Sequence, residues 1–308
     1  MVGRLLLQAR NKFGHGPRVA YYRDVVRPRI LKTAPINTAS GGVAEVVVLS
    51  SHNDLLNLLW SLKSFYHQTR ENFPLVILDD GSFTGVDTAT VLSHFPNARL
   101  ILAERANSEV PTILRGYPLC ARFREFHPLA RKIFDAAFYL SADRMLLLDS
   151  DLVFFRKPEE LLAAAAGHCP AHNAFNEDVQ PGLNISGDEA TIRFDIQLLD
   201  RFNSGCGVLR REALRLDWME EFLSAESIWN GHPWRIEQTL LALAACRDGA
   251  ALLPSTYRVS LEAGIEGCVM RHYVGAVRHL MYREGIATLM RKGLLNSLND
   301  DRTRLVQR

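Results

Sequence analysis

Cysteine is scarce in this sequence, and its placement excludes two classes of protein. The 308 residues contain five cysteines, an odd number, and no two of them form a C-x-x-C pair. A disulfide scaffold requires an even, regularly spaced set, and a zinc ribbon requires close pairs. We therefore expect free, buried thiols in the reducing environment of the cytoplasm. The five are Cys120, Cys169, Cys206, Cys246 and Cys268.

Long apolar runs are absent as well. No run approaches the roughly 20 residues that a bilayer-spanning helix needs. The N-terminus has no continuous apolar segment followed by a small-residue cleavage site, so we expect a soluble chain that is not exported. Apolar residues still make up 47% of the sequence, which is enough for a sizeable core and excludes wholesale disorder.

The chain also lacks a strong net charge. A formal charge of +2 argues against a protein that binds nucleic acid along its whole surface. The charge is nevertheless uneven, with +7 in residues 1–36, +5 in residues 271–308 and −10 between them. Because basic ends are attracted to acidic lipid, we expect peripheral contact with the inner face of a membrane.

Proline and glycine divide the chain into three parts. The first 42 residues contain several prolines and end in Ser40-Gly41-Gly42, which is typical of a flexible joint. We interpret residues 1–42 as a basic N-terminal extension, residues 43–285 as the single folded domain, and residues 286–308 as a basic C-terminal tail.

Within that domain, strand-length apolar runs alternate with helical patterns. This alternation predicts an α/β fold with a mostly parallel sheet flanked by helices. Strands are predicted over residues 46–49, 75–78, 100–103, 145–148 and 207–209. Helices are predicted over residues 55–66, 87–95, 129–140, 158–166, 211–223 and 234–245. The polar residues 172–195 predict a long loop, which either lines the acceptor site or is merely solvated.

Two carboxylates follow the buried run at residues 145–148. Asp149-Ser150-Asp151 begins where that strand ends, and ligands of open α/β sheets bind at this edge. Carboxylate oxygens are the ligands that Mg²⁺ and Mn²⁺ prefer, and both ions accept phosphate beside them. A solvated turn with two acids is the alternative. Leu78-Asp79-Asp80-Gly81-Ser82 repeats the pattern at another strand end, where an ordinary turn explains it equally well.

Five segments in order resemble a known family. The chain is similar to the GT-A glycosyltransferases over residues 43–285, and most similar to the retaining type typified by glycogenin and the bacterial lipopolysaccharide galactosyltransferases. The segments are Leu78-Asp79-Asp80-Gly81-Ser82, Leu148-Asp149-Ser150-Asp151-Leu152-Val153, Phe202-Asn203-Ser204-Gly205-Cys206-Gly207-Val208-Leu209, Glu237-Gln238 and His272-Tyr273-Val274-Gly275.

The resemblance implies a GT-A domain that uses Mn²⁺ or Mg²⁺ to bind a nucleotide-sugar donor, usually a UDP-sugar. The implied metal ligands are Asp149, Asp151 and His272. The implied donor-binding residues are Ser50, Asn53, Asp80, Lys132, Asp149, Gly275 and Arg278, with Lys132 and Arg278 as cations for the leaving group. The implied acceptor-binding residues are Asn203 and Ser204.

The resemblance also implies transfer with retention at the anomeric carbon. In this family a glutamine amide lies close to the reacting carbon, and Gln238 matches it. Gln238 cannot act as a base, so its carbonyl oxygen would stabilise the developing positive charge. Glu237 would orient the acceptor or act as the nucleophile. The alternative is that both are exposed polar residues of their helix.

The sequence departs from the family at three places. Residues 50–53 read Ser-Ser-His-Asn where members often carry acids for the nucleobase. Glu237-Gln238 replaces an Asp-Gln pair, and Arg278-His279-Leu280 replaces Lys-Pro-Trp.

Two other functions fit the same residues. One is a non-catalytic nucleotide-sugar-binding protein with the GT-A frame. The other is a haloacid-dehalogenase-type phosphohydrolase, in which Asp149 attacks phosphate and Asp151 serves as acid and base.

Overall fold

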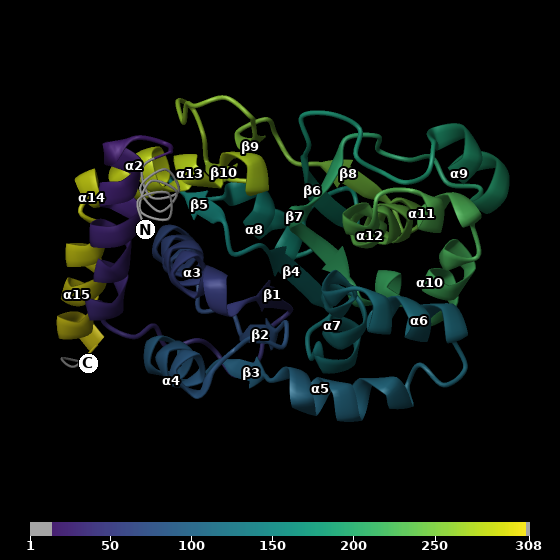
Figure 1. Cartoon of the computed structure of the whole chain (residues 1–308), viewed down its shortest axis with the longest axis horizontal. Helices are drawn as coiled ribbons and strands as arrows, with labels where there is room; N and C mark the ends of the chain where they lie inside the picture. Colours follow the sequence, from purple (N-terminus) through teal and green to yellow (C-terminus); the bar gives the residue numbers. More distant parts are fainter. Residues whose placement is uncertain (1–13, 306–308) are drawn as a thin grey trace, which may run out of the picture.

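A single mixed sheet organises the molecule (Figure 1). The computed structural model describes residues 14–305, with side chains to residue 300. In this part of the chain ten strands pair in the order β3-β2-β1-β4-β7-β6-β9-β10-β5, with β8 beside β6. The strands are β1 Ala44–Ser50, β2 Leu75–Asp79, β3 Arg99–Ile101, β4 Arg144–Leu148, β5 Leu152–Phe154, β6 Asn173–Glu177, β7 Phe202–Arg210, β8 Ala250–Leu252, β9 Tyr257–Val259 and β10 Met270–His272.

Helices cover both faces of this sheet. They are α2 Pro17–Tyr21, α3 Leu55–Thr69, α4 Gly85–His94, α5 Ala103–Glu109, α6 Pro118–Phe126, α7 Phe134–Tyr139, α8 Glu159–Ala165, α9 Gly187–Phe194, α10 Leu216–Leu223, α11 Glu226–Asn230, α12 Ile236–Arg247, α13 Arg278–Leu280, α14 Ala287–Arg291 and α15 Leu294–Leu305. Short 3₁₀ or π turns are η1 Tyr22–Val26, η2 Arg27–Lys32, η3 His52–Asp54, η4 Val110–Thr112, η5 Pro128–Lys132, η6 Arg211–Leu214, η7 Pro233–Arg235, η8 Gly275–Val277 and η9 Met281–Ile286.

The pairing confirms the predicted α/β class with a mostly parallel sheet. Strands β3, β2, β1 and β4 are parallel neighbours, whereas β7 lies antiparallel between β4 and β6. The runs predicted at residues 46–49, 75–78 and 145–148 lie inside β1, β2 and β4. Continuous apolar runs predict these strands well because parallel strands are buried on both faces.

The prediction of a long loop at residues 172–195 is wrong. Strand β6 and helix α9 lie there. Strand β6 is polar yet buried because its asparagines bond to the backbone: Asn173 Nδ2 donates to Ala245 O at 3.1 Å, and Asn176 Oδ1 accepts from Cys206 N at 3.2 Å. Helix α9 begins at Ser186, whose side chain accepts from Glu189 N. The Ser-x-x-Glu sequence was the signal for this cap.

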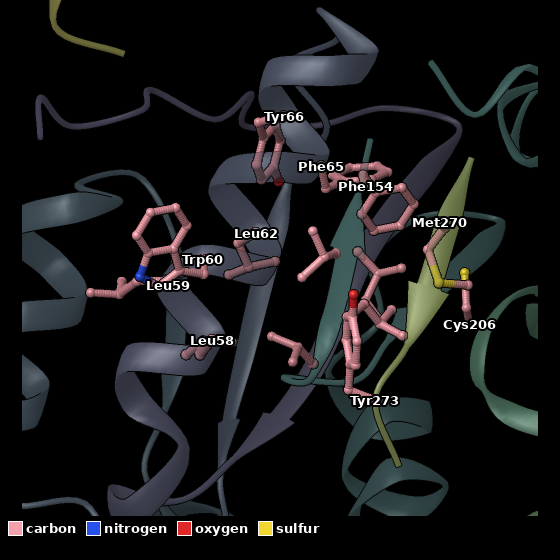
Figure 2. Packing of buried hydrophobic residues seen from close by; sticks show 14 of the residues in the cluster. Leu58, Leu59, Trp60, Leu62, Phe65, Tyr66, Phe154, Cys206, Met270 and Tyr273 are labelled. Carbon is pink, nitrogen blue, oxygen red and sulfur yellow. The ribbon is translucent and has the colours of Figure 1, made fainter. Parts of the chain in front are cut away.

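Helix α3 fills the space between the sheet and the N-terminal segment. It is buried almost all round, and Figure 2 shows its side chains with Phe154, Met270 and Tyr273 of the sheet layer. The rings of Phe65 and Phe154 meet edge to face with centroids 5.2 Å apart. Buried Lys63 donates from Nζ to Ala34 O at 2.6 Å, which ties the chain before β1 to the helix.

The chain before residue 43 packs on the same core. Val19, Val26 and Ile30 are buried in the cluster that contains α3. Trp60 Nε1 donates to Arg27 O at 2.9 Å, and Ala34 N donates to Asn299 Oδ1 of α15 at 2.9 Å. Figure 1 shows the two terminal parts side by side at one end of the molecule. The proposed boundaries at residues 42 and 285 stay predictions.

The cysteine prediction is confirmed in part. All five cysteines are free, and Cys120, Cys206 and Cys268 are buried, whereas Cys169 and Cys246 are half-buried. Among the described helices, none combines the length and the apolar character needed to cross a membrane.

Paired substitutions test whether residues 17–34 share the core. Ile30 is fully buried and Leu31 beside it is 45% exposed. We expect Ile30→Ala to lower the free energy of unfolding by about 2–5 kcal/mol through lost burial and a cavity. Leu31→Ala should change it by no more than about 0.5 kcal/mol. Urea denaturation measures both, and equally small losses would mean that the segment is an independent extension.

Candidate functional site

The loop between β4 and β5 carries the two carboxylates, and neighbouring elements hold its backbone. Asp149 N donates to Gly205 O at 2.8 Å, and Tyr273 N donates to Asp151 O at 3.0 Å. From α3, Ser61 Oγ donates to Asp149 O at 3.1 Å, and Ser64 Oγ accepts from Phe154 N at 3.1 Å. The loop therefore has little freedom to move.

The side chains of Asp149, Asp151 and His272 come together at this loop. One ligand atom from each lies within 4.8 Å of the others. His272 Nε2 lies 3.1 Å from Asp151 Oδ1 and 3.6 Å from Asp149 Oδ2. Two carboxylates and an imidazole form a donor set that suits Mn²⁺ or Mg²⁺, with Mn²⁺ favoured by the nitrogen ligand.

The imidazole is oriented by an asparagine. His272 Nδ1 lies 3.0 Å from Asn203 Oδ1, an acceptor, so the proton is on Nδ1 and Nε2 faces the carboxylates. Metal-binding histidines commonly have such a partner on the other ring nitrogen. Burial lowers the pKa of His272, but Asp151 and Asp149 outweigh this effect and raise it above its usual value. A Cβ at position 205 would lie 2.2 Å from His272 Cε1, so glycine is required there.

Two cations flank the carboxylates. Lys132 is buried, and its Nζ lies 2.8 Å from Asp149 Oδ1 and 3.1 Å from Glu237 Oε1. Burial lowers the pKa of Lys132, but these two acids raise it by more, so the amine stays charged. Arg278 Nη2 lies 2.9 Å from Asp151 Oδ2. Burial raises the pKa of Asp151, but His272 and Arg278 more than reverse this and lower it to about 2.

The pair Glu237-Gln238 opens α12 beside this cluster. Glu237 is buried, and its Oε2 accepts from Ser204 Oγ at 3.1 Å. Burial raises the pKa of Glu237, and Lys132 offsets part of that shift. Gln238 Oε1 accepts from Ser204 N at 3.3 Å, and its Nε2 donates to Gly182 O at 3.3 Å. The predicted alternative of two exposed helix residues is therefore wrong for Glu237.

Two adjoining cavities lie over the cluster at the carboxyl edge of the sheet. The first, about 370 Å³, is lined by Ser50, Ser51, Asp54 and Asp80 from the ends of β1 and β2, and by Lys132, Asp149, Asp151, Trp234 and Arg278. The second, about 430 Å³, is lined by Asp178, Gln180, Asn203, Ser204, Glu237, Gln238, His272 and Gly275, together with the shared residues Leu129, Lys132, Asp149, Asp151, Trp234 and Arg278.

The structure thus places most of the expected site residues around one opening. Asn53 is the exception, because it is exposed and lines neither cavity. Ser50 borders the first cavity, and its buried Oγ has no hydrogen-bond partner among the described residues. The roles of these residues stay predictions.

Sequence reasoning missed Asp54 and Trp234. Asp54 Oδ1 lies 3.1 Å from Arg278 Nη1, and Asp54 lines the first cavity. The signal was present, because Asp54 directly follows the Ser-Ser-His-Asn segment. Trp234 was assigned to a helix, whereas it lies in the turn η7 before α12.

Comparisons with known proteins place this geometry in a known fold. No protein-family model and no curated protein matches the sequence. Among solved structures, the galactosyltransferase LgtC with donor and acceptor sugar analogues superposes with a TM-score of 0.54 at 14% identity, over 82% of this chain and 95% of that one. The chain has the GT-A fold.

Two further structures agree with this likeness. Mouse xyloside xylosyltransferase 1 has a TM-score of 0.51 at 13% identity, over 79% of this chain and 99% of its own. The bifunctional glycosyltransferase WbbM has 0.50 at 15% identity, over 78% of this chain, and this chain spans about half (47%) of WbbM. At this level of identity the likeness establishes the fold.

Metal binding to the three-residue cluster can be measured directly. We expect wild-type protein to bind Mn²⁺ and Asp151→Asn to bind it at least about 10-fold more weakly, because one anionic ligand is lost. Asp188→Asn, which removes an exposed carboxylate from α9, is the matched control. Isothermal titration measures both, and equal affinities in the two variants would place the ion elsewhere.

Proposed function

We propose that the protein is a metal-dependent glycosyltransferase that transfers a hexose from a nucleotide-sugar donor to an acceptor. The observation that carries this proposal is the Asp149, Asp151 and His272 cluster flanked by Lys132 and Arg278 at the carboxyl edge of a GT-A sheet. The likeness to LgtC, whose structure holds donor and acceptor sugar analogues, supports the reaction class.

The donor lies across both cavities in this proposal. The nucleoside occupies the first cavity, where Asp54 and Asp80 offer polar atoms to a base and a ribose. A UDP-sugar is favoured by the resemblance to the retaining family. The diphosphate lies at the metal ligands, beside Gly275. Nothing lies within 4 Å of the position a Cβ would occupy at Gly275, so the backbone is open to a phosphate.

The chemistry is charge stabilisation. The anomeric carbon–oxygen bond to the diphosphate breaks, and the acceptor oxygen forms the new bond to that carbon. The proton of the acceptor hydroxyl passes to the departing phosphate oxygen. A Mn²⁺ or Mg²⁺ ion held by Asp149, Asp151 and His272 would supply Lewis-acid stabilisation of the leaving group. Lys132 and Arg278 supply fixed positive charge in a partly dry site, where it acts most strongly.

The surroundings of Glu237 favour retention. An inverting enzyme needs a carboxylate free to accept the acceptor's proton. Both oxygens of Glu237 already have partners in Lys132 and Ser204, and the side chain is buried. Gln238, half-buried and lining the second cavity, is the neutral group beside the reacting carbon.

The two other candidate functions are not equally compatible with the structure. A phosphohydrolase of the haloacid-dehalogenase type is not supported, because β1, β2 and β3 precede the Asp149 loop and the chain has the GT-A fold. A protein that binds nucleotide sugars without transferring them would share the same cavities. The activity assay below distinguishes it from an enzyme.

We also propose that the protein works in the cytoplasm at an anionic membrane surface. Arg18, Arg29 and Lys32 are exposed on the N-terminal segment, and Arg291 and Lys292 are exposed after η9. Each such residue contributes about 1 kcal/mol near an acidic lipid surface. The remaining basic residues of this prediction at positions 1–13 and 306–308 lie outside the described residues.

Removing one metal ligand tests the enzyme directly. With Mn²⁺ and a screen of nucleotide sugars, we expect Asp151→Ala to lose at least about 10²-fold in sugar transfer or donor hydrolysis, because the diphosphate charge is left uncompensated. Asp188→Asn should retain the wild-type rate. Near-wild-type turnover in EDTA would contradict metal dependence, and UDP binding without any turnover would favour the binding protein.

The stereochemistry of the product tests retention. With a UDP-α-sugar we expect the first-formed product to be α-linked, since Glu237 is held by Lys132 and Ser204 and is not free to serve as a base. Proton NMR of the anomeric signal, recorded before the product equilibrates, measures this. A β-linked product would show inversion and redirect attention to Glu237 as the base.

A further inference from the structure

A tryptophan stands exposed where the two cavities meet. Trp234 is 59% exposed, yet it lines both the first and the second cavity together with Leu129 and Lys132. The side chain comes from the turn η7, four residues before Gln238 on the same stretch of chain. The indole is therefore next to the reacting groups and contributes little to the core.

A neighbouring aromatic ring supports the indole of Trp234. The ring of His127 meets it edge to face, with centroids 4.5 Å apart and an interplanar angle of 87°. His127 is only 7% exposed, and its Nδ1 accepts from Leu129 N at 3.2 Å. Burial lowers the pKa of His127, so the supporting ring is neutral. A surface whose orientation is fixed before binding loses less entropy when a ligand arrives.

Single exposed hydrophobic residues are common on proteins and need no explanation by themselves. What distinguishes Trp234 is the set of polar groups that share its cavity. Asp178, Gln180 and Arg235 line the second cavity beside it and offer a carboxylate, an amide and a guanidinium. A flat apolar ring bordered by planar polar groups matches a pyranose, which has an apolar C–H face and a rim of hydroxyls.

We propose that Trp234 is the platform on which a pyranose ring of the acceptor stacks, so that the acceptor is a saccharide. This inference rests on the proposed function and names its acceptor class. The indole holds the sugar face, and the polar groups of the second cavity orient the hydroxyl that attacks. Trp234 is thus a positioning residue for the acceptor.

The nucleobase is the competing occupant of the indole. The unpartnered Ser50 Oγ, with Asp54 and Asp80, comes from the ends of β1 and β2. Trp234 comes instead from the chain that leads into Gln238, and it borders the cavity that holds Glu237 and Gln238. The acceptor must enter at that junction, because the anomeric carbon lies there.

The test compares Trp234→Ala and Trp234→Phe with Phe126→Ala. Phe126 is an exposed aromatic (56%) next to His127 in sequence, and it lines neither cavity. The probes are the methyl α- and β-pyranosides of galactose, glucose, mannose and xylose. Three rates or affinities are measured with Mn²⁺: donor hydrolysis by water, transfer to the pyranosides, and UDP binding.

We expect Trp234→Ala to lower kcat/KM for the best pyranoside about 10- to 100-fold, chiefly through KM, as for a lost stacking partner. Donor hydrolysis and UDP affinity should stay within about twofold of wild type. Trp234→Phe should recover most of the loss, and Phe126→Ala should show none. An unchanged kcat/KM overturns the proposal, and an equal loss of UDP affinity assigns the indole to the base.

Saturation-transfer NMR with the same pyranosides and Mg²⁺–UDP, in which the ion is diamagnetic, keeps the inference testable without turnover. Contact signals from the sugar C–H face that vanish in Trp234→Ala support it, and signals that persist overturn it. A wild-type protein that neither hydrolyses nor transfers any donor would refute the proposed function instead.

Discussion

The repulsion between Asp149 and Asp151 is the constraint around which the site is built. Two carboxylates one residue apart in a partly dry loop cannot both stay ionised unless positive charge balances them. Lys132 and Arg278 supply that balance, and they come from different parts of the chain. The order of strands follows this need, since β10 must lie against β5 to bring His272 over the loop.

Uncharged side chains position several members of this cluster. Asn203 orients His272, while Ser61 and Ser64 of α3 fix the loop that presents the carboxylates. Truncating any one partner leaves a buried polar group unsatisfied, which costs more than the hydrogen bond contributes. The two glycines have contrasting roles. Gly205 is required by the protein, because a side chain would strike His272, whereas the space beside Gly275 is open.

Much of this arrangement was readable in the sequence, and the exceptions have physical causes. The first half of the sheet was predicted because β1, β2 and β4 are continuous apolar runs. Strand β6 was missed because its burial depends on asparagines that bond to the backbone of other segments, which no local pattern shows. The packing of residues 17–34 was missed for a related reason. Short turns interrupted by proline have no helical periodicity, and their burial comes from contacts with α3 and α15.

The site residues also fall into those that a local sequence pattern predicts and those that it does not. Only Ser150 separates Asp149 from Asp151 in the sequence, so it was evident that the two carboxylates lie close together. Lys132 and Glu237, in contrast, pair although they lie far apart in the sequence. That pairing bears on the replacement of the family's aspartate by Glu237. The buried carboxylate of Glu237 accepts from Ser204 and pairs with Lys132, and it thereby holds the amine within reach of Asp149. A carboxylate held between Lys132 and Ser204 in this way is not free to move toward an acceptor hydroxyl. The same contact that positions Lys132 therefore keeps Glu237 in the wall of the second cavity, next to Gln238.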